Sequence, residues 1–117
     1  MTHYQGTCHC GAVTFYIKAG EITDGMRCDC SICRRKGAVL SSFTLPPEHI
    51  EIDADKDALA IYKFGTQTAT HYFCRICGIF TFVETRLIPG HFRVNLGCID
   101  GIDIFALSAP VFDGKSI

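Results

Sequence analysis

The spacing of the cysteines is the strongest chemical signal in this sequence of 117 residues. Seven of the eight cysteines fall into the motifs Cys8-x-Cys10, Cys28-x-Cys30-x-x-Cys33 and Cys74-x-x-Cys77. Two thiols separated by one or two residues can point at the same metal ion, whereas a disulfide framework usually spreads its cysteines over distant loops. Because the N-terminus shows no secretory pattern, we expect a cytoplasmic protein with reduced thiols. We therefore interpret the motifs as metal ligands and keep disulfides as the less favoured alternative.

The first and last motifs both end in Cys-Gly, at Gly11 and Gly78, and both lead into a strand pattern. A glycine after a ligating cysteine lets the backbone turn back, so that its amide groups approach the sulfur. Two such turns that face each other form a tetrahedral site of four thiolates, which is a common structural zinc site. Such an ion would staple the first strand to the middle of the fold. The predicted ligands of this structural zinc are Cys8, Cys10, Cys74 and Cys77.

The middle motif places three thiols, Cys28, Cys30 and Cys33, within six residues. A structural zinc takes four protein ligands, whereas a catalytic zinc typically takes three and keeps one position open. We favour an exchangeable fourth position at this second zinc. Two alternatives stay open, which are closure of the site by Cys98 or a histidine, and a trio that binds no metal. Because Cys98 lies among apolar residues, we expect it to be a buried small hydrophobe.

Three thiolates around a zinc favour another sulfur as the fourth ligand. A thiol bound there would lose its proton and could attack a carbonyl carbon or leave from an adduct. Arg34, Arg35 and Lys36 follow the motif and could hold a carboxylate of the thiol substrate through a forked contact. For each basic residue taken singly, a solvated turn is the favoured interpretation. His71 could serve as a general base, although an ordinary strand histidine is favoured.

Alternation of apolar and polar residues predicts the elements that position these motifs. Within 12–18, Val13, Phe15 and Ile17 alternate with more polar neighbours, which is typical of a half-buried antiparallel strand. A short helical turn is predicted over 31–36, with Ser31 as its N-terminal cap. Many short strands divided by turn residues predict one mostly-β domain over residues 1–117. The further predicted strands lie at 38–45, 49–53, 58–64, 69–73, 79–84, 91–96 and 103–107.

Charge and composition exclude several classes of function. The 11 basic and 12 acidic residues give a formal net charge of −1, which disfavours a dedicated nucleic-acid binder because phosphate contacts require a basic surface. A hydrophobic fraction of 48% argues for a packed core and against a disordered chain. No apolar run is long enough for a membrane span. We therefore expect a partner that is neither a nucleic acid nor a membrane.

The three cysteine motifs and Cys98 lie within four longer stretches, at residues 6–15, 28–38, 72–78 and 94–101. In their residues and their order these stretches resemble the glutathione-dependent formaldehyde-activating (GFA) family, also called the centromere-protein-V/GFA domain. The resemblance implies an Mss4-like fold of packed short antiparallel sheets, with the same division into a four-cysteine zinc site and a three-cysteine zinc site. It also implies the activity that joins glutathione to formaldehyde as S-hydroxymethylglutathione, which belongs to the carbon–sulfur lyases.

The leading hypothesis is a zinc-dependent carbon–sulfur lyase that acts on an adduct of glutathione or a similar small thiol. The thiol would bind at the second zinc on Cys28, Cys30 and Cys33, with Arg34 or Arg35 as the anchor of its carboxylate. This hypothesis expects two zinc ions per chain, one structural and one exchangeable. The alternative is a non-catalytic binding or interaction module that keeps only the structural zinc. The sequence predicts neither the aldehyde nor the oligomeric state.

Overall fold

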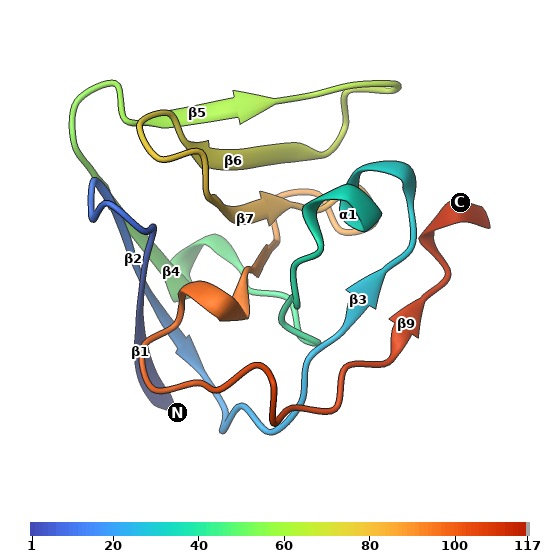
Figure 1. The fold of residues 1–117 in the computed structure, drawn as a ribbon, viewed down its shortest axis with the longest axis horizontal. Coiled ribbons are helices and arrows are strands. Elements are labelled where there is room, and N and C mark those ends of the chain that lie inside the picture. The colour runs from blue at the N-terminus through green and yellow to red at the C-terminus, as the bar shows by residue number, and fades with distance from the viewer. Residues whose placement is uncertain (117) are drawn as a thin grey trace.

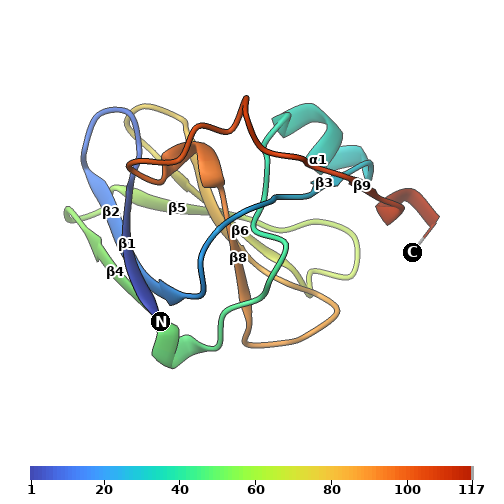
Figure 2. The same cartoon turned by 90° about the horizontal axis from the view of Figure 1, so that it is seen from below.

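The computed structural model describes residues 1–116, which form a mostly-β architecture of three small sheets and one short helix, α1 (Ser31–Lys36) (Figures 1 and 2). Short 3₁₀ turns lie at Pro47–His49, Leu96–Cys98 and Gly114–Ser116. The mostly-β prediction is therefore confirmed. The strands are β1 (Thr2–Thr7), β2 (Val13–Ala19), β3 (Arg27–Cys28), β4 (Ile50–Ala54), β5 (Leu59–Tyr62), β6 (Thr70–Cys74), β7 (Phe80–Glu84), β8 (Phe92–Val94) and β9 (Val111–Phe112).

The first sheet has the strand order β1-β2-β4, and all of its pairings are antiparallel. Its central strand β2 buries Val13, Phe15 and Ile17, whereas Tyr16 between them is exposed. The predicted alternation is therefore correct, because side chains two residues apart lie on the same face of a strand. This face of β2 packs against the larger sheet.

The second sheet has the order β5-β6-β7-β8 and is also antiparallel. Phe82 of β7 is fully buried and meets Phe15 of the first sheet edge-to-face, with ring centroids 5.5 Å apart. Val94 and Leu96 complete the centre of the main core. Edge-to-face aromatic packing adds to the burial of apolar surface, so this contact is central to the packing of the two sheets.

A second, smaller core cluster is separate from the main core that contains Phe15 and Phe82. Its buried members are small side chains and thiols, none larger than Val13. Because the hydrophobic contribution scales with the apolar area removed from water, such a cluster stabilises the contact between the sheets only weakly. The buried members are Cys8, Ala12, Val13, Ala58 and Cys74.

The third sheet consists of two short strands, β3 and β9, which pair in parallel. Arg27 pairs with Val111 and Cys28 with Phe112, so the last part of the chain returns beside the start of α1. Figure 1 shows these two strands side by side next to the helix, with the C-terminus close by. This pairing positions the middle cysteine motif.

Two of the predicted strands are wrong. Segment 38–45 is a connector between the sheets that forms only isolated bridges, at Leu40 and Leu45. Segment 103–107 forms turns, because the Asp103 carboxylate accepts the Phe105 N–H at 3.0 Å and thereby holds a local bend. Strands β1, β3 and β9 were not predicted from the sequence.

The remaining predicted strands coincide with β2, β4, β5, β6, β7 and β8 to within a few residues. The helical prediction over 31–36 matches the bounds of α1. Among residues 1–116, no helix has the length and apolar character that crossing a membrane requires.

We predict that Gly6→Ala destabilises the protein by about 1–3 kcal/mol, the usual cost of overpacking. Gly6 pairs with Phe15 across β1 and β2, and a Cβ on Gly6 would overlap the buried Phe15 ring. Gly20→Ala is the matched control, because a Cβ there meets nothing within 4 Å. Urea unfolding of the three proteins measures the difference, and an equal loss in both variants would contradict the prediction.

Candidate metal centres

Two hairpin turns bring four of the predicted ligands together. Cys8 and Cys10 lie in the connection from β1 to β2, whereas Cys74 ends β6 and Cys77 lies in the turn to β7. The Sγ atom of Cys10 is 3.7 Å from that of Cys8 and 3.6 Å from that of Cys74. All four Sγ atoms lie within 4.8 Å of one another. We call them the four-cysteine group.

The backbone of both hairpin turns curls around a sulfur. The Val13 N–H donates to Cys8 Sγ at 3.3 Å, and the Cys77 N–H donates to Cys74 Sγ at 3.5 Å. Gly11 and Gly78 have φ angles of 86° and 79°, in the left-handed region that glycine adopts without strain. The glycines therefore have the role that the Cys-Gly pattern predicts.

The geometry of this group fits a tetrahedral metal ion. Zn–S bonds of about 2.3 Å arranged tetrahedrally place the sulfurs roughly 3.8 Å apart, close to the separations of Cys10 from its two neighbours. The four-cysteine group could therefore hold a metal ion, and its donor set is one that zinc prefers.

The thiols of this group do not ionise independently. Burial opposes ionisation of Cys8, but hydrogen bonds from the Val13 N–H and neighbouring thiols outweigh it and lower the pKa of Cys8. For Cys10, the Ala12 N–H favours the thiolate, but desolvation and the adjacent thiols raise its pKa to about 11. Four thiolates at this spacing therefore require a cation between them.

The second group consists of Cys28, Cys30 and Cys33, whose Sγ atoms also lie within 4.8 Å of one another. Cys28 ends β3, Cys30 caps the N-terminus of α1, and Cys33 lies one turn along that helix. We call it the three-cysteine group, and it could also hold a metal ion. Within residues 1–116, no histidine or carboxylate joins these three as a fourth ligand.

The helix cap differs from the prediction. Cys30, not Ser31, is the N-cap: its backbone is extended, and its Sγ accepts the Cys33 N–H at 3.5 Å. Ser31 is the first residue of the helix. The same Cys-x-x-Cys hydrogen bond occurs in both groups, because the first sulfur replaces the oxygen of an ordinary capping side chain.

Cys98 lies outside both groups. It is buried in the main core, as predicted, and its Sγ lies 3.6 Å from the Phe80 carbonyl oxygen. Burial raises the pKa of Cys98 to about 12, so this thiol stays protonated at neutral pH. In this structure Cys98 therefore does not close the three-cysteine group.

Two of the three thiols in the three-cysteine group resist ionisation. Burial raises the pKa of Cys28 and of Cys33, and for Cys33 the neighbouring Cys30 thiol raises it further. For Cys30, burial acts in the same direction, but the hydrogen bond from the Cys33 N–H outweighs it and lowers the pKa. The positive charge of Lys36 favours the thiolate of Cys33.

Lys36 forms a buried pair with His71 beside this group. Its Nζ lies 2.6 Å from His71 Nδ1 and 3.5 Å from the centroid of the Phe80 ring. Burial lowers the pKa of Lys36 to about 8, and burial together with the Lys36 charge lowers that of His71 to about 4. Neutral His71 therefore accepts a hydrogen bond from Lys36 at Nδ1, and no carboxylate of the described residues pairs with the ammonium group.

The other cations near the three-cysteine group differ in exposure. Arg34 and Arg35, the predicted anchors, are exposed on α1, and Arg35 Nη1 donates to the Ser31 carbonyl at 2.8 Å. Arg93 on β8 was not singled out from the sequence. It is partly buried, donates to the Ser41 carbonyl at 2.9 Å, and interacts electrostatically with Cys28. Only the fold brings Arg93 to this group, so no local sequence signal identifies it.

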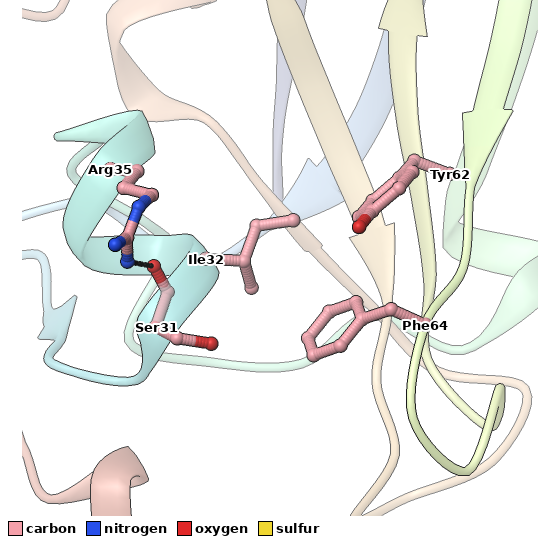
Figure 3. A pocket seen from close by; sticks show the side chains of 5 residues that line it. All are labelled: Ser31, Ile32, Arg35, Tyr62 and Phe64. Atoms are coloured by element: carbon pink, nitrogen blue, oxygen red, sulfur yellow. Dashed lines mark hydrogen bonds between the residues drawn. The ribbon is translucent and has the colours of Figure 1, made fainter.

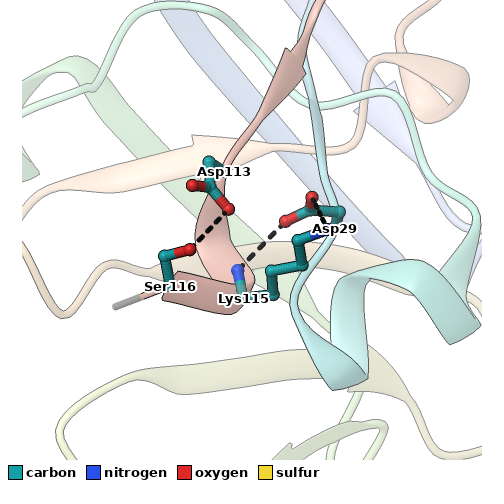
Figure 4. A network of polar contacts seen from close by, with 4 residues as sticks. All are labelled: Asp29, Asp113, Lys115 and Ser116. Atoms are coloured by element: carbon teal, nitrogen blue, oxygen red, sulfur yellow. Dashed lines mark hydrogen bonds and ion pairs between the residues drawn. The ribbon is translucent and has the colours of Figure 1, made fainter.

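The C-terminal turn packs directly on the three-cysteine group. A Cβ on Gly114 would collide with Cys28 Sγ and lie 3.2 Å from Cys30 Cβ. The Lys115 N–H donates to the Asp29 carboxylate at 3.0 Å, and Lys115 Nζ lies 3.9 Å from the other carboxylate oxygen (Figure 4). Glycine at 114 therefore allows the close approach, and Asp29 holds the turn in place.

We predict that Cys74→Ser abolishes metal binding at the four-cysteine group and leaves no cooperative unfolding transition. A structural zinc site contributes on the order of 10 kcal/mol to folding, comparable with the whole stability of a domain. Cys98→Ala is the control, because it removes a thiol outside both groups. Metal analysis and thermal unfolding measure the effect, and a cooperative Cys74→Ser protein with unchanged metal content would contradict it.

Comparison with known proteins supports the observed fold. A crystal structure of a Rhodobacter sphaeroides protein, solved as a structural genomics target, is 38% identical in sequence and superposes with a TM-score of 0.84. The match covers 92% of the present chain and 99% of that protein. The mostly-β arrangement of small antiparallel sheets with cysteine clusters fits the Mss4-like fold.

A family model described as "Glutathione-dependent formaldehyde-activating enzyme" matches residues 3–114, which include both cysteine groups. The match therefore extends from β1 to the glycine that packs on Cys28. The resemblance inferred from the cysteine motifs is confirmed over nearly the whole chain. This protein belongs to the glutathione-dependent formaldehyde-activating enzyme family.

Proposed function

We propose that this protein is a zinc-dependent carbon–sulfur lyase that makes or breaks the bond between a glutathione-type thiol and a carbonyl carbon. The observation that carries the proposal is the difference between the two groups, since one offers four thiols and the other three. Three protein ligands leave a position for a substrate in catalytic zinc sites. The family description supports glutathione as the thiol and formaldehyde as the carbonyl compound.

In this proposal the three-cysteine group binds the exchangeable zinc and the four-cysteine group the structural zinc. A zinc ion on three thiolates would supply the positive charge that stabilises the sulfur of the substrate as a thiolate. Arg35, Arg34 and Lys115 are exposed cations on α1 and on the C-terminal turn. They are candidates for binding the carboxylates of glutathione, and Arg34 and Arg35 keep the role expected from the sequence.

Lys36 is the proposed carrier of the proton. Its neutral amine takes the proton from the substrate S–H, and the sulfur lone pair then forms the C–S bond with the carbonyl carbon. The π electrons of the carbonyl group move to its oxygen, and the Lys36 ammonium group returns the proton there. The reverse sequence releases the carbonyl compound. His71 orients Lys36 through the 2.6 Å contact at Nδ1.

We predict that Cys28→Ser stays folded, binds one zinc fewer than the wild type and loses catalysis. The wild type should accelerate the exchange of ¹³C-formaldehyde with its glutathione adduct, observed by NMR, whereas the Cys28→Ser rate should fall to the uncatalysed background. Cys98→Ala is the control for loss of a thiol outside both groups. A wild-type protein that holds a single tightly bound zinc and ignores glutathione would favour the binding-module alternative instead.

We predict that Lys36→Met and Lys36→Arg both lower kcat by about a hundredfold or more, the usual range for general acid–base catalysis. Arginine keeps the positive charge but does not release its proton at neutral pH. Restoration of the rate by arginine would therefore show that Lys36 supplies charge alone. Zinc content and unfolding midpoints, measured on both variants, separate this effect from damage to the site.

A further inference from the structure

A groove runs between α1 and the end of β5, beside the three-cysteine group. One cavity of about 450 Å³ includes Ser31, Ile32 and Arg35 on the helix side and Tyr62 and Phe64 on the opposite side. Figure 3 shows Ile32 facing Tyr62 and Phe64 across the opening, with Arg35 turned back toward the Ser31 carbonyl. A neighbouring cavity of about 340 Å³ shares Ile32 and Tyr62 with the first, so the two lie side by side, and we call them together the groove.

The wall of the groove opposite α1 is aromatic and open to solvent. Tyr62 and Phe64 stack with their centroids 5.7 Å apart, and Phe64 stacks on His71 at 5.8 Å. The exposed fractions of Tyr62 and Phe64 are 50% and 41%. Aromatic rings that are about half exposed offer apolar surface to a planar ligand. Phe80 and Phe73 continue the apolar lining in the second cavity.

The charged side chains of the groove are all basic. Arg35 lines the first cavity and Lys36 the second, and within residues 1–116 no carboxylate lines either of them. Burial keeps His71 neutral, as described above. The groove therefore complements a ligand that combines an apolar group with a negative charge.

The groove adjoins the three-cysteine group through α1. Lys36, which lines the second cavity, lies three residues after Cys33 on this helix. Residues three apart on a helix have Cβ atoms about 5–6 Å from each other and face the same side. A ligand whose sulfur lies at the three-cysteine group can therefore extend its substituent into this groove.

We propose that the groove binds an apolar, planar substituent on the carbon that is bonded to the substrate sulfur. The substrate class is then the glutathione adducts of aromatic carbonyl compounds, and not of formaldehyde alone, whose adduct has no substituent to fill the groove. The inference rests on the proposed function and uses the same chemistry. The C–S bond forms or breaks while one proton moves between the sulfur and the carbonyl oxygen through Lys36.

The test compares two stable thioethers, S-benzylglutathione and S-methylglutathione, which differ in the aromatic ring. Isothermal titration of the zinc-loaded wild type should show the benzyl compound binding about tenfold more tightly, a difference of about 1.4 kcal/mol. Phe64→Ser should remove this preference and leave the affinity for S-methylglutathione and the zinc content unchanged. Phe105→Ser is the matched control, because Phe105 is 93% exposed and lines neither cavity.

The outcomes distinguish this inference from the proposed function. Equal binding of the two thioethers by the wild type, unchanged in Phe64→Ser, would overturn the aromatic groove and leave the glutathione site standing. If the wild type bound neither of the two thioethers nor glutathione itself, both proposals would be overturned. Loss of the benzyl preference in Phe105→Ser as well as in Phe64→Ser would also overturn the groove, since the effect would not be local.

Discussion

The meeting of four thiols between two hairpin turns is the contact on which the rest of the structure depends. It lies where the two larger sheets share only small buried side chains, such as Ala12 and Ala58. Apolar burial of that size contributes little free energy, and thiols packed together repel as they ionise. A metal ion would convert this weak and repulsive contact into a strong one. The two sheets that pack through Phe15 and Phe82 would then be held in a fixed relative position.

The two cysteine groups share a local design and differ in their surroundings. In each, a Cys-x-x-Cys turn directs a backbone N–H to the first sulfur. The buried side chains that pack with the four-cysteine group are small, and include Ala12, Val13 and Ala58. Around the three-cysteine group lie Lys36, Arg93 and an aromatic groove. The proposed division between a structural and a chemical role therefore rests on the neighbours of the sulfurs as much as on their number.

Much of the candidate site could be predicted because its signals are local. Thiols two or three residues apart are brought together by a single turn, and the alternation in β2 reflects one buried face. The prediction failed where contacts between residues far apart in the sequence determine the structure. Strands β3 and β9 have two residues each and exist only because they pair with each other. The Lys36–His71 contact joins residues 35 positions apart, and Arg93 reaches Cys28 from another sheet. No pattern along the chain encodes such neighbours.

The parallel pairing of β3 with β9 also sets an order of assembly. During synthesis the chain emerges from its N-terminus, so Cys77 becomes available well before Val111 and Phe112. The two hairpin turns of the four-cysteine group can close while the last segment is still within the ribosome. The three-cysteine group acquires its final wall only when Gly114 is released and packs on Cys28. In the nascent protein, closure of the four-cysteine group can therefore precede completion of the three-cysteine group.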